Sequence, residues 1–492
     1  MAQPTNRRLT TLDASFLYVE KANQPMHVGS VGVYEGMLTR QDVIDVLNAR
    51  LHQLPRYRQK VVFPPFGINH PTWEDDTAFD IRQHIDEATL PKPGDDRALS
   101  EGAGRLFAQV LDRAHPLWKL IVLHGHESGN TMLLSMVHHA MVDGVSGVDL
   151  TMIMHELTAD AAPPEPPAAP WEPRPQPDPL TLLQDAVRDR MTETAQSWTD
   201  ESFRLFRPQE LNRRAEQITN AITTSMPFLM QPAPRTPFNG PLSGERQFSW
   251  AQFSFSEVRA IRATLGGTVN DVVLAVLAGG LGRYLERHDY PTIGIELRAM
   301  CPVSMRRPEE QGALGNLVSM MFAPLYVGIK DPVERLNAER QAMERLKTGG
   351  QAAGLFALTD FARNVPPTWQ AFASQFDVPN TLLNTVSTNV PGPQIPLYLA
   401  GKKLLHWYPL GPLASNIGLF VAILSYNQVL TMGTTVDPKQ VPDPWVFAEC
   451  LQASFAELRD AAAQAASSRG APEAAPAKNG GAARRTKQLA RA

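Results

Sequence analysis

The chain contains the stretch Met136-Val137-His138-His139-Ala140-Met141-Val142-Asp143-Gly144. The run Thr131–Val137, which leads into the histidines, is short and mostly apolar and predicts a buried strand. Adjacent side chains of an extended backbone point to opposite faces, so His138 and His139 cannot both face one cavity. We therefore expect one histidine to take part in chemistry and the other to support it.

The spacing H-H-x-x-x-D-G suits the transfer of an acyl group. A neutral imidazole with a pKa near the working pH can take the proton from an alcohol as that alcohol attacks a carbonyl. Asp143, four residues after His139, is better placed to fix the local backbone or to pair with an arginine than to hold that proton. Gly144 would permit a tight turn into a following helix, which Ser146 can cap.

Two other interpretations of the histidine pair remain open. The pair can be purely structural, or it can bind zinc. Paired zinc ligands usually share one helix face at spacing i, i+4, as in H-E-x-x-H, and that pattern is absent here. The sequence therefore favours catalysis, and we expect no metal.

The H-H-x-x-x-D-G stretch resembles that of the CoA-dependent acyltransferase superfamily, which includes chloramphenicol acetyltransferase and the condensation domains of peptide synthetases. Four further motifs narrow the resemblance to the bacterial wax ester synthase/acyl-CoA:diacylglycerol acyltransferase family. They are Leu12-Asp13-Ala14-Ser15-Phe16, Pro116-Leu117-Trp118, Asn270-Asp271 and Gly315-Asn316. The resemblance runs from about Leu9 to about Ala461.

This resemblance implies an α/β fold of two chloramphenicol-acetyltransferase-like domains, with mixed sheets and flanking helices, joined by a long crossover. An active-site tunnel would lie between them, and acyl-CoA and the acceptor would reach His139 from opposite ends. In the family pattern the second histidine, here His139, is the general base. We assign supporting roles to His138, Asp143 and Gly144.

The implied reaction is the esterification of diacylglycerol to triacylglycerol, with acyl-CoA as a substrate and no cofactor. The alternatives are wax ester synthesis from long-chain alcohols and a related acyl or condensation transfer on the same fold. A lipid-binding protein without enzymatic activity is a third possibility.

Length and composition agree with a globular protein. The 492 residues suffice for two domains, and the apolar share of 43% with 20% charged residues is ordinary. A net charge of −4 gives no indication of nucleic-acid binding. The two cysteines, Cys301 and Cys450, are too few for a disulfide framework and are consistent with a reducing cytoplasm. The start of the chain, Met1–Leu12, lacks the apolar run of a signal peptide.

Composition also suggests boundaries. Nine prolines between Pro163 and Pro179 predict an extended crossover. We expect an N-terminal domain over 1–160, a connector over 161–237, a C-terminal domain over 238–463 and a disordered basic tail over 464–492. The longest apolar run, Val272–Leu281, is about half of what a bilayer requires. Peripheral contact with the inner face of a membrane or with a lipid droplet remains possible, through the connector or the tail.

Outside the histidine pair, two residues are site candidates. Thr268 and Asp271 have the spacing of a capping box, which explains this region structurally, yet the Asn270 amide could also stabilise an oxyanion near the helix start. Arg306 follows a predicted strand and is our candidate partner for Asp143, because a buried carboxylate needs a paired donor.

Three residues before the histidine pair have simpler interpretations. Arg56 and Arg58 form a basic patch that indicates a solvated face or, less commonly, a phosphate site. Trp73 is expected in an acidic loop.

Overall fold

The computed structural model describes residues 7–141, 152–161, 169–205, 219, 231–304, 318–348, 367–374 and 380–470. Most of the described strands belong to two six-stranded sheets. The first sheet contains β1 (His27–Tyr34), β4 (Ile85–Thr89), β5 (Trp118–His124), β6 (Thr131–His138), β11 (Tyr398–Leu399) and β12 (Lys402–Leu410). The second contains β7 (Gln247–Ser254), β8 (Leu297–Ser304), β9 (Val318–Leu325), β10 (Thr385–Pro391), β13 (Leu419–Tyr426) and β14 (Val429–Val436). A separate hairpin pairs β2 (Gln59–Val62) with β3 (Thr72–Asp75).

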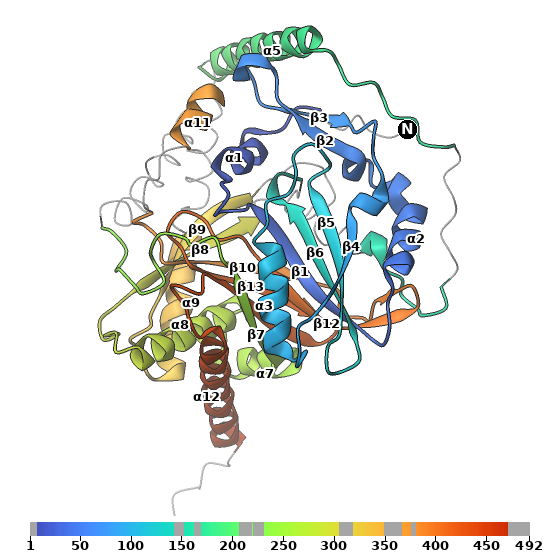
Figure 1. The fold of residues 1–492 in the computed structure, drawn as a ribbon. Helices are drawn as coiled ribbons and strands as arrows, with labels where there is room; N and C mark the ends of the chain where they lie inside the picture. Colours follow the sequence, from blue (N-terminus) through green and yellow to red (C-terminus); the bar gives the residue numbers. More distant parts are fainter. Residues whose placement is uncertain are drawn as a thin grey trace, which may run out of the picture.

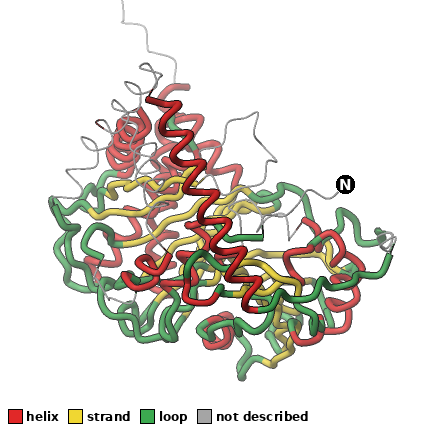
Figure 2. Tube along the Cα trace, turned by 90° about the horizontal axis from the view of Figure 1, so that it is seen from above, coloured by secondary structure: helices red, strands yellow, loops and turns green. Residues whose placement is uncertain are grey.

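Both sheets are mixed, as predicted. The first has the order β11-β12-β1-β6-β5-β4, in which only β4 and β5 run parallel. The second has the order β7-β14-β13-β10-β8-β9, in which β10 is parallel to both of its neighbours. Figure 2 shows the strands of the two sheets side by side.

Helices cover the sheets (Figure 1). They are α1 (Thr11–Val19), α2 (Arg40–Arg50), α3 (Asp96–Phe107), α5 (Pro179–Leu205), α7 (Phe255–Leu265), α8 (Val269–Arg287), α9 (Pro332–Thr348), α11 (Pro367–Ala373) and α12 (Pro444–Gly470). Helix α8 packs between α9 and α12 and is apolar on nearly all sides, as a core helix is. The capping box predicted at Thr268 with Asp271 is present at the start of α8, and a second one, Thr39 with Asp42, starts α2.

Each sheet has its own hydrophobic core, but the two halves of the chain interlock. Strand β12 comes from the C-terminal half and pairs with β1 in the first sheet. Helix α3 of the N-terminal half lies on β7 of the second, where the Ser100 hydroxyl donates to the Phe248 carbonyl. The two-domain α/β architecture is therefore confirmed, whereas the boundaries at 160, 237 and 463 stay predictions.

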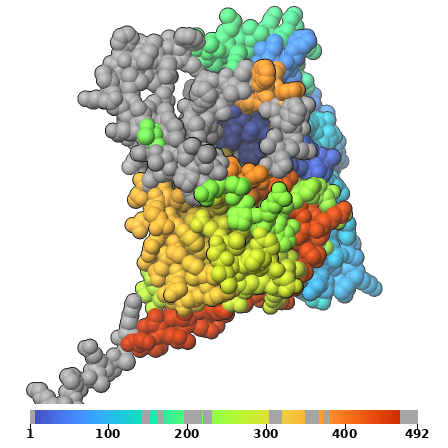
Figure 3. Space-filling model, turned by 90° about the vertical axis from the view of Figure 1, so that its left-hand side faces the viewer, coloured from blue at the N-terminus to red at the C-terminus, as the bar shows by residue number. Residues whose placement is uncertain are grey.

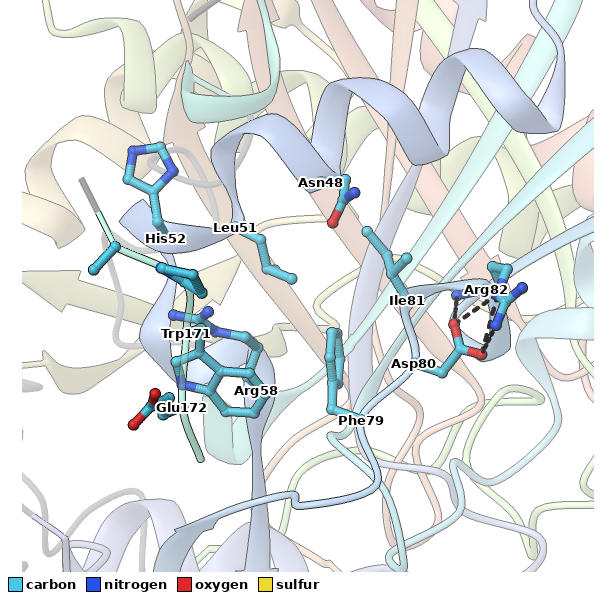
Figure 4. Close-up of a pocket in the computed structure, with 12 residues that line it drawn as sticks. Asn48, Leu51, His52, Arg58, Phe79, Asp80, Ile81, Arg82, Trp171 and Glu172 are labelled. Atoms are coloured by element: carbon cyan, nitrogen blue, oxygen red, sulfur yellow. Dashed lines mark hydrogen bonds and ion pairs between the residues drawn. The ribbon is translucent and has the colours of Figure 1, made fainter. Parts of the chain in front are cut away.

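The described end of the crossover is anchored on the N-terminal half. Residues 169–178 form neither helix nor strand. The Arg58 guanidinium lies 4.4 Å from the centre of the Trp171 ring, and Arg174 pairs with Asp75 at 3.2 Å. The crossover thereby closes one side of a cavity of about 760 Å³, with Phe79 on the facing wall (Figure 4).

Some elements differ from the sequence predictions. Trp73 is buried in β3 rather than placed in a loop, because Arg56 stacks on its ring at 4.6 Å and shields it. Arg58 is likewise buried rather than part of a solvated face. Helix α12 continues to Gly470, so residues 464–470 are helical rather than part of a disordered tail, since its last turns are rich in alanine, a strong helix former.

A helix that spans a membrane needs both sufficient length and sufficient hydropathy. Within the described residues, no single helix meets both requirements. The pair α7 and α8 meets them together but is bent by 100°.

Candidate active site

The histidine pair stands where β6 leaves the first sheet. In the register of β1 and β6, His138 lies opposite His27. The backbone N–H of His138 donates to the Leu117 carbonyl at 2.9 Å, and that of His139 donates to the Met26 carbonyl at 2.8 Å. Neighbouring segments therefore hold both backbones from opposite sides, which fixes the direction in which each side chain leaves the strand.

His138 points into the interior and is completely buried. Its Nδ1 accepts a hydrogen bond from the Ala140 N–H at 3.0 Å, so in the neutral ring the proton is assigned to Nε2. Nε2 lies 3.3 Å from Glu20 Oε1, an ion-pair distance without hydrogen-bond alignment. This ring is held from both ends and is suited to positioning its neighbour.

Glu20 links His138 to a cation. Its carboxylate is almost fully buried, pairs with Arg113 at 2.9 Å and accepts the Met26 N–H at 3.1 Å. Burial raises the pKa of Glu20, but His138, the Met26 N–H and Arg113 outweigh burial and bring it to about 2. Glu20 therefore remains a carboxylate at neutral pH, in a row that runs from the partly exposed Arg113 through Glu20 to the buried His138.

His139 has a different environment. Its ring is half-buried and stacks on Phe16 of α1, with 3.8 Å between ring centres and 16° between planes. Its Nδ1 is buried and has no hydrogen-bond partner. The stack covers one face of the imidazole and restricts its rotation without occupying a nitrogen.

Burial is the main effect on the pKa of His139 and lowers it. The backbone carbonyl of His139 itself raises the pKa, and the charge of His138 lowers it, so that the resulting pKa is about 4. The ring is therefore neutral at physiological pH, and because Nδ1 is enclosed by the protein, the other nitrogen, Nε2, is the one that can accept a proton. A half-buried neutral imidazole with fixed orientation can accept a proton from a hydroxyl group that approaches its accessible edge.

The remaining site candidates are only partly placed. Asp143, Gly144 and Arg306 lie outside the described residues, as do Ser146, Gly315 and Asn316. Asn270 is in the first turn of α8, where its Oδ1 accepts from the Asn389 amide at 3.4 Å. The described contacts do not join Asn270 to His139.

Sequence reasoning missed three residues around the pair, namely Phe16, Glu20 and Arg113. The sequence motif at residues 12–16 gives Phe16 no role by itself, whereas the structure shows that it places Phe16 against His139. Glu20 follows α1 directly, so a spacing of four residues from Phe16 was the available signal. Arg113 carried none, because it lies 93 residues from Glu20 in the chain.

The second half of the chain supports this site through the loop 20–26. The Ser415 N–H donates to Gln24 Oε1 at 2.8 Å, and the Arg246 guanidinium donates to the Asn23 carbonyl at 2.9 Å. The same loop supplies the Met26 carbonyl that holds His139. The site is therefore built where the two halves meet.

Neither metal nor thiol chemistry is indicated at the described residues. Within them, no three histidine, cysteine or acidic side chains gather closely enough to hold a metal ion. Both cysteines are buried, and burial raises the pKa of Cys301 to about 12, which keeps it a thiol.

Comparison with known proteins agrees with the motifs. Residues 9–273 match the model of the wax ester synthase/diacylglycerol acyltransferase catalytic domain, and residues 314–459 match that of the C-terminal domain of the same family. A candidate diacylglycerol O-acyltransferase of Mycobacterium tuberculosis (strain H37Rv) is 30% identical over 469 residues, covering 93% of this chain and 98% of the relative.

Solved structures show the same fold. A wax ester synthase/diacylglycerol acyltransferase from Marinobacter aquaeolei VT8 superposes with a TM-score of 0.63 at 25% identity, covering 93% of this chain and all of that one. The first condensation domain of the calcium-dependent antibiotic synthetase gives 0.59 at 15% identity, over 94% and 97% of the two chains, and shows the fold alone. The resemblance inferred from the motifs is thus confirmed: the chain belongs to the wax ester synthase/diacylglycerol acyltransferase family and is an acyltransferase.

Proposed function

We propose that this acyltransferase esterifies diacylglycerol to triacylglycerol with acyl-CoA as donor, and that His139 is its general base. The observation that carries the proposal is the state of the His139 imidazole, which is neutral and half-buried, stacks on Phe16 and has Nδ1 enclosed by the protein, so that Nε2 is left for the acceptor hydroxyl. A ring held in this way can accept a proton without first breaking another hydrogen bond.

In the proposed reaction the acceptor hydroxyl oxygen attacks the carbonyl carbon of the thioester while its proton moves to His139. The tetrahedral intermediate then collapses with cleavage of the C–S bond. The imidazolium returns the proton to the leaving sulfur, so coenzyme A departs as a thiol and His139 is neutral again. Acyl-CoA is a substrate here, and the reaction requires no cofactor and no covalent enzyme intermediate.

Base catalysis supplies part of the acceleration. A positioned base contributes typically 10²–10⁴-fold, and placement of the reactants and stabilisation of the oxyanion supply more. Asn270 is our candidate for stabilising the oxyanion. A pair between Asp143 and Arg306 is our candidate for supporting the H-H-x-x-x-D-G stretch. A tunnel between the two halves would bring donor and acceptor to His139 from opposite ends.

The acceptor is the finer part of the proposal. The relative from Mycobacterium tuberculosis is named as a candidate diacylglycerol O-acyltransferase and matches nearly the whole chain. This favours diacylglycerol as the acceptor. The Marinobacter protein is named for both activities. Long-chain alcohols, which would give wax esters, are therefore the second candidate for the acceptor. Both acceptors are apolar molecules with one reacting hydroxyl, so His139 would perform the same step on either.

The test is a competition between acceptors. Purified full-length protein is incubated with labelled palmitoyl-CoA and equal amounts of dioleoylglycerol and hexadecanol, and the products are separated by thin-layer chromatography. We expect more labelled triacylglycerol than wax ester. Wax ester as the main product would replace the proposed acceptor, and no product from either would reject the proposed function.

A further inference from the structure

Three segments that lie far apart in the sequence expose large apolar side chains on one side of the molecule. The first is the turn η3 (Pro65–Gly67), the second is α5 and the third is α11. We call their exposed residues the apolar face, which consists of Phe66, Leu180, Val187, Met191, Trp369 and Phe372.

The three segments adjoin one another. A Cβ atom built on Gly67 would lie 3.4 Å from the Thr368 side chain, so η3 touches the start of α11. The turn also packs on α5, and the Asn69 amide beside it donates to the Ala186 carbonyl at 3.3 Å. Figure 3 shows α5 in green, a blue segment and α11 in orange in contact at the top of one side of the molecule. The segments that carry the apolar face are therefore neighbours on one side of the molecule.

Helix α5 has two apolar stripes. Leu182 and Ala186 are buried and attach the helix to the rest of the protein. Leu180, Val187 and Met191, at spacings of seven and four residues, form a separate stripe on another side, and Met191 is 68% exposed. The buried stripe explains how the helix is held, whereas the exposed stripe has no structural explanation in the described residues.

Of the residues on the apolar face, Phe66 is the one whose position is least explained by a contribution to the stability of the fold. Its side chain is 83% exposed, and its backbone has φ 61° and ψ 6°, in the left-handed region that bulky residues avoid. An asparagine or glycine would adopt this turn at lower cost. Strain of this kind, combined with an exposed aromatic ring, points to a use outside the folded core.

The apolar face carries no net charge. Residues 63–67 and α11 contain no charged side chain. Along the exposed turns of α5, Arg188 pairs with Asp185 at 2.7 Å, and Arg190 lies 3.9 Å from Glu193. Asp189 is paired with Arg8 at 2.7 Å. A surface that is apolar, aromatic and internally neutralised does not match an anionic partner, but it matches an uncharged layer of lipid.

We propose that the apolar face inserts into the surface of a phospholipid layer whose headgroups carry no net charge. The choice of a lipid layer rests on the proposed function, because an acceptor such as diacylglycerol resides in one. Helix α11 packs on α1, the helix that places Phe16 against His139, and the Ser374 hydroxyl donates to the Tyr18 carbonyl at 3.0 Å. In Figure 3 the dark-blue N-terminal segment is visible in a recess below α11. Docking would thus set the layer beside this recess and beside α1, which carries Phe16.

The test uses flotation of full-length protein with vesicles of pure phosphatidylcholine. Phe66→Asn removes the ring at a backbone conformation that asparagine accepts, so its melting temperature should not fall. We expect it to weaken the partition coefficient about tenfold, as the loss of one buried large side chain does, and Phe66→Asn with Trp369→Ser about a hundredfold. Ile293→Ser is the matched control, since Ile293 is 87% exposed in the loop between α8 and β8, and it should bind as wild type.

Two further measurements distinguish other partners. Raising the salt from 0.1 to 0.5 M, or adding phosphatidylglycerol, should change binding less than about threefold. Unchanged binding by the double variant would overturn the proposal. Binding that requires phosphatidylglycerol and is lost in salt would overturn it in favour of the basic tail. A wild-type dimer in sedimentation velocity that the double variant abolishes, with no vesicle binding, would assign the face to a second copy of the chain.

The outcome is separable from that of the proposed function. His139→Ala should bind vesicles as wild type does, because His139 is not on the apolar face. Wild-type protein that binds vesicles and transfers no acyl group would remove the proposed function and keep the docking surface. Wild-type protein that transfers acyl groups to detergent-dispersed acceptor but does not bind vesicles would remove only the docking surface.

Discussion

Replacing Glu20 with glutamine tests whether the row Arg113–Glu20–His138 positions the catalytic histidine. The carboxylate is 2% exposed, and its pKa falls from 4.5 to about 2 on folding. At about 1.4 kcal/mol for each pKa unit, the charged form stabilises the folded state by about 3 kcal/mol. Because the folded pKa is the lower one, this stability is complete above pH 4.5 and is lost as the pH falls through 2.

Urea denaturation of wild type and Glu20→Gln checks this value. We expect a difference of up to about 3 kcal/mol at pH 7, which narrows by about 1.4 kcal/mol for each pH unit below 4.5. In an acyl-transfer assay, kcat should fall while KM changes little, since Glu20 acts on His139 through His138 and not on the substrate. Equal stability of the two proteins at pH 7, or a rise in KM with kcat unchanged, would refute the reasoning.

Three further outcomes follow from the structure. The acid limb of the pH profile of kcat/KM should have its midpoint near pH 4, since burial lowers the pKa of His139 to about 4. A midpoint near pH 6.5 in a profile from pH 4 to 8 would contradict this. His27 also has a pKa of about 4, below its unfolded 6.5, so it costs about 3 kcal/mol of stability as the pH falls from 6.5 to 4. In urea denaturation, the free energy of unfolding of His27→Gln should therefore vary by about 3 kcal/mol less than that of wild type over this pH range. Equal variation in the two proteins would exclude the assignment. Thr268→Ala should lower the free energy of unfolding by about 1 kcal/mol by removing the N-cap of α8, and an unchanged urea midpoint would argue against it.

Patterns within a few residues predicted much of the local structure. The apolar run Thr131–Val137 before the histidine pair predicts β6 with nearly its observed ends. Thr268 with Asp271 predicts the start of α8, because a capping box is specified by side chains three positions apart.

Contacts between distant segments could not be predicted in this way. Nothing local in β12 shows that it pairs with β1, because register between strands so far apart in sequence depends on the packing of the whole chain. The basic stretch at Arg58 indicates a surface position. The burial of Arg58 depends on the crossover, which places Trp171 against its guanidinium group. The partners of His138 come from residues 20 and 113, so the motif identified the histidines but not what orients them.

The central claim is that a neutral imidazole at position 139 takes the proton of the acceptor hydroxyl. Its most direct test is the kcat of His139→Ala in transfer from palmitoyl-CoA to dioleoylglycerol, with His115→Ala as the control, since His115 contacts Asp76 at 3.4 Å and lies outside the described site. The proposed mechanism predicts a loss of about 10²–10⁴-fold in the first variant with an unchanged circular dichroism spectrum, and near wild-type activity in the second. Turnover by folded His139→Ala within a few-fold of wild type would contradict it.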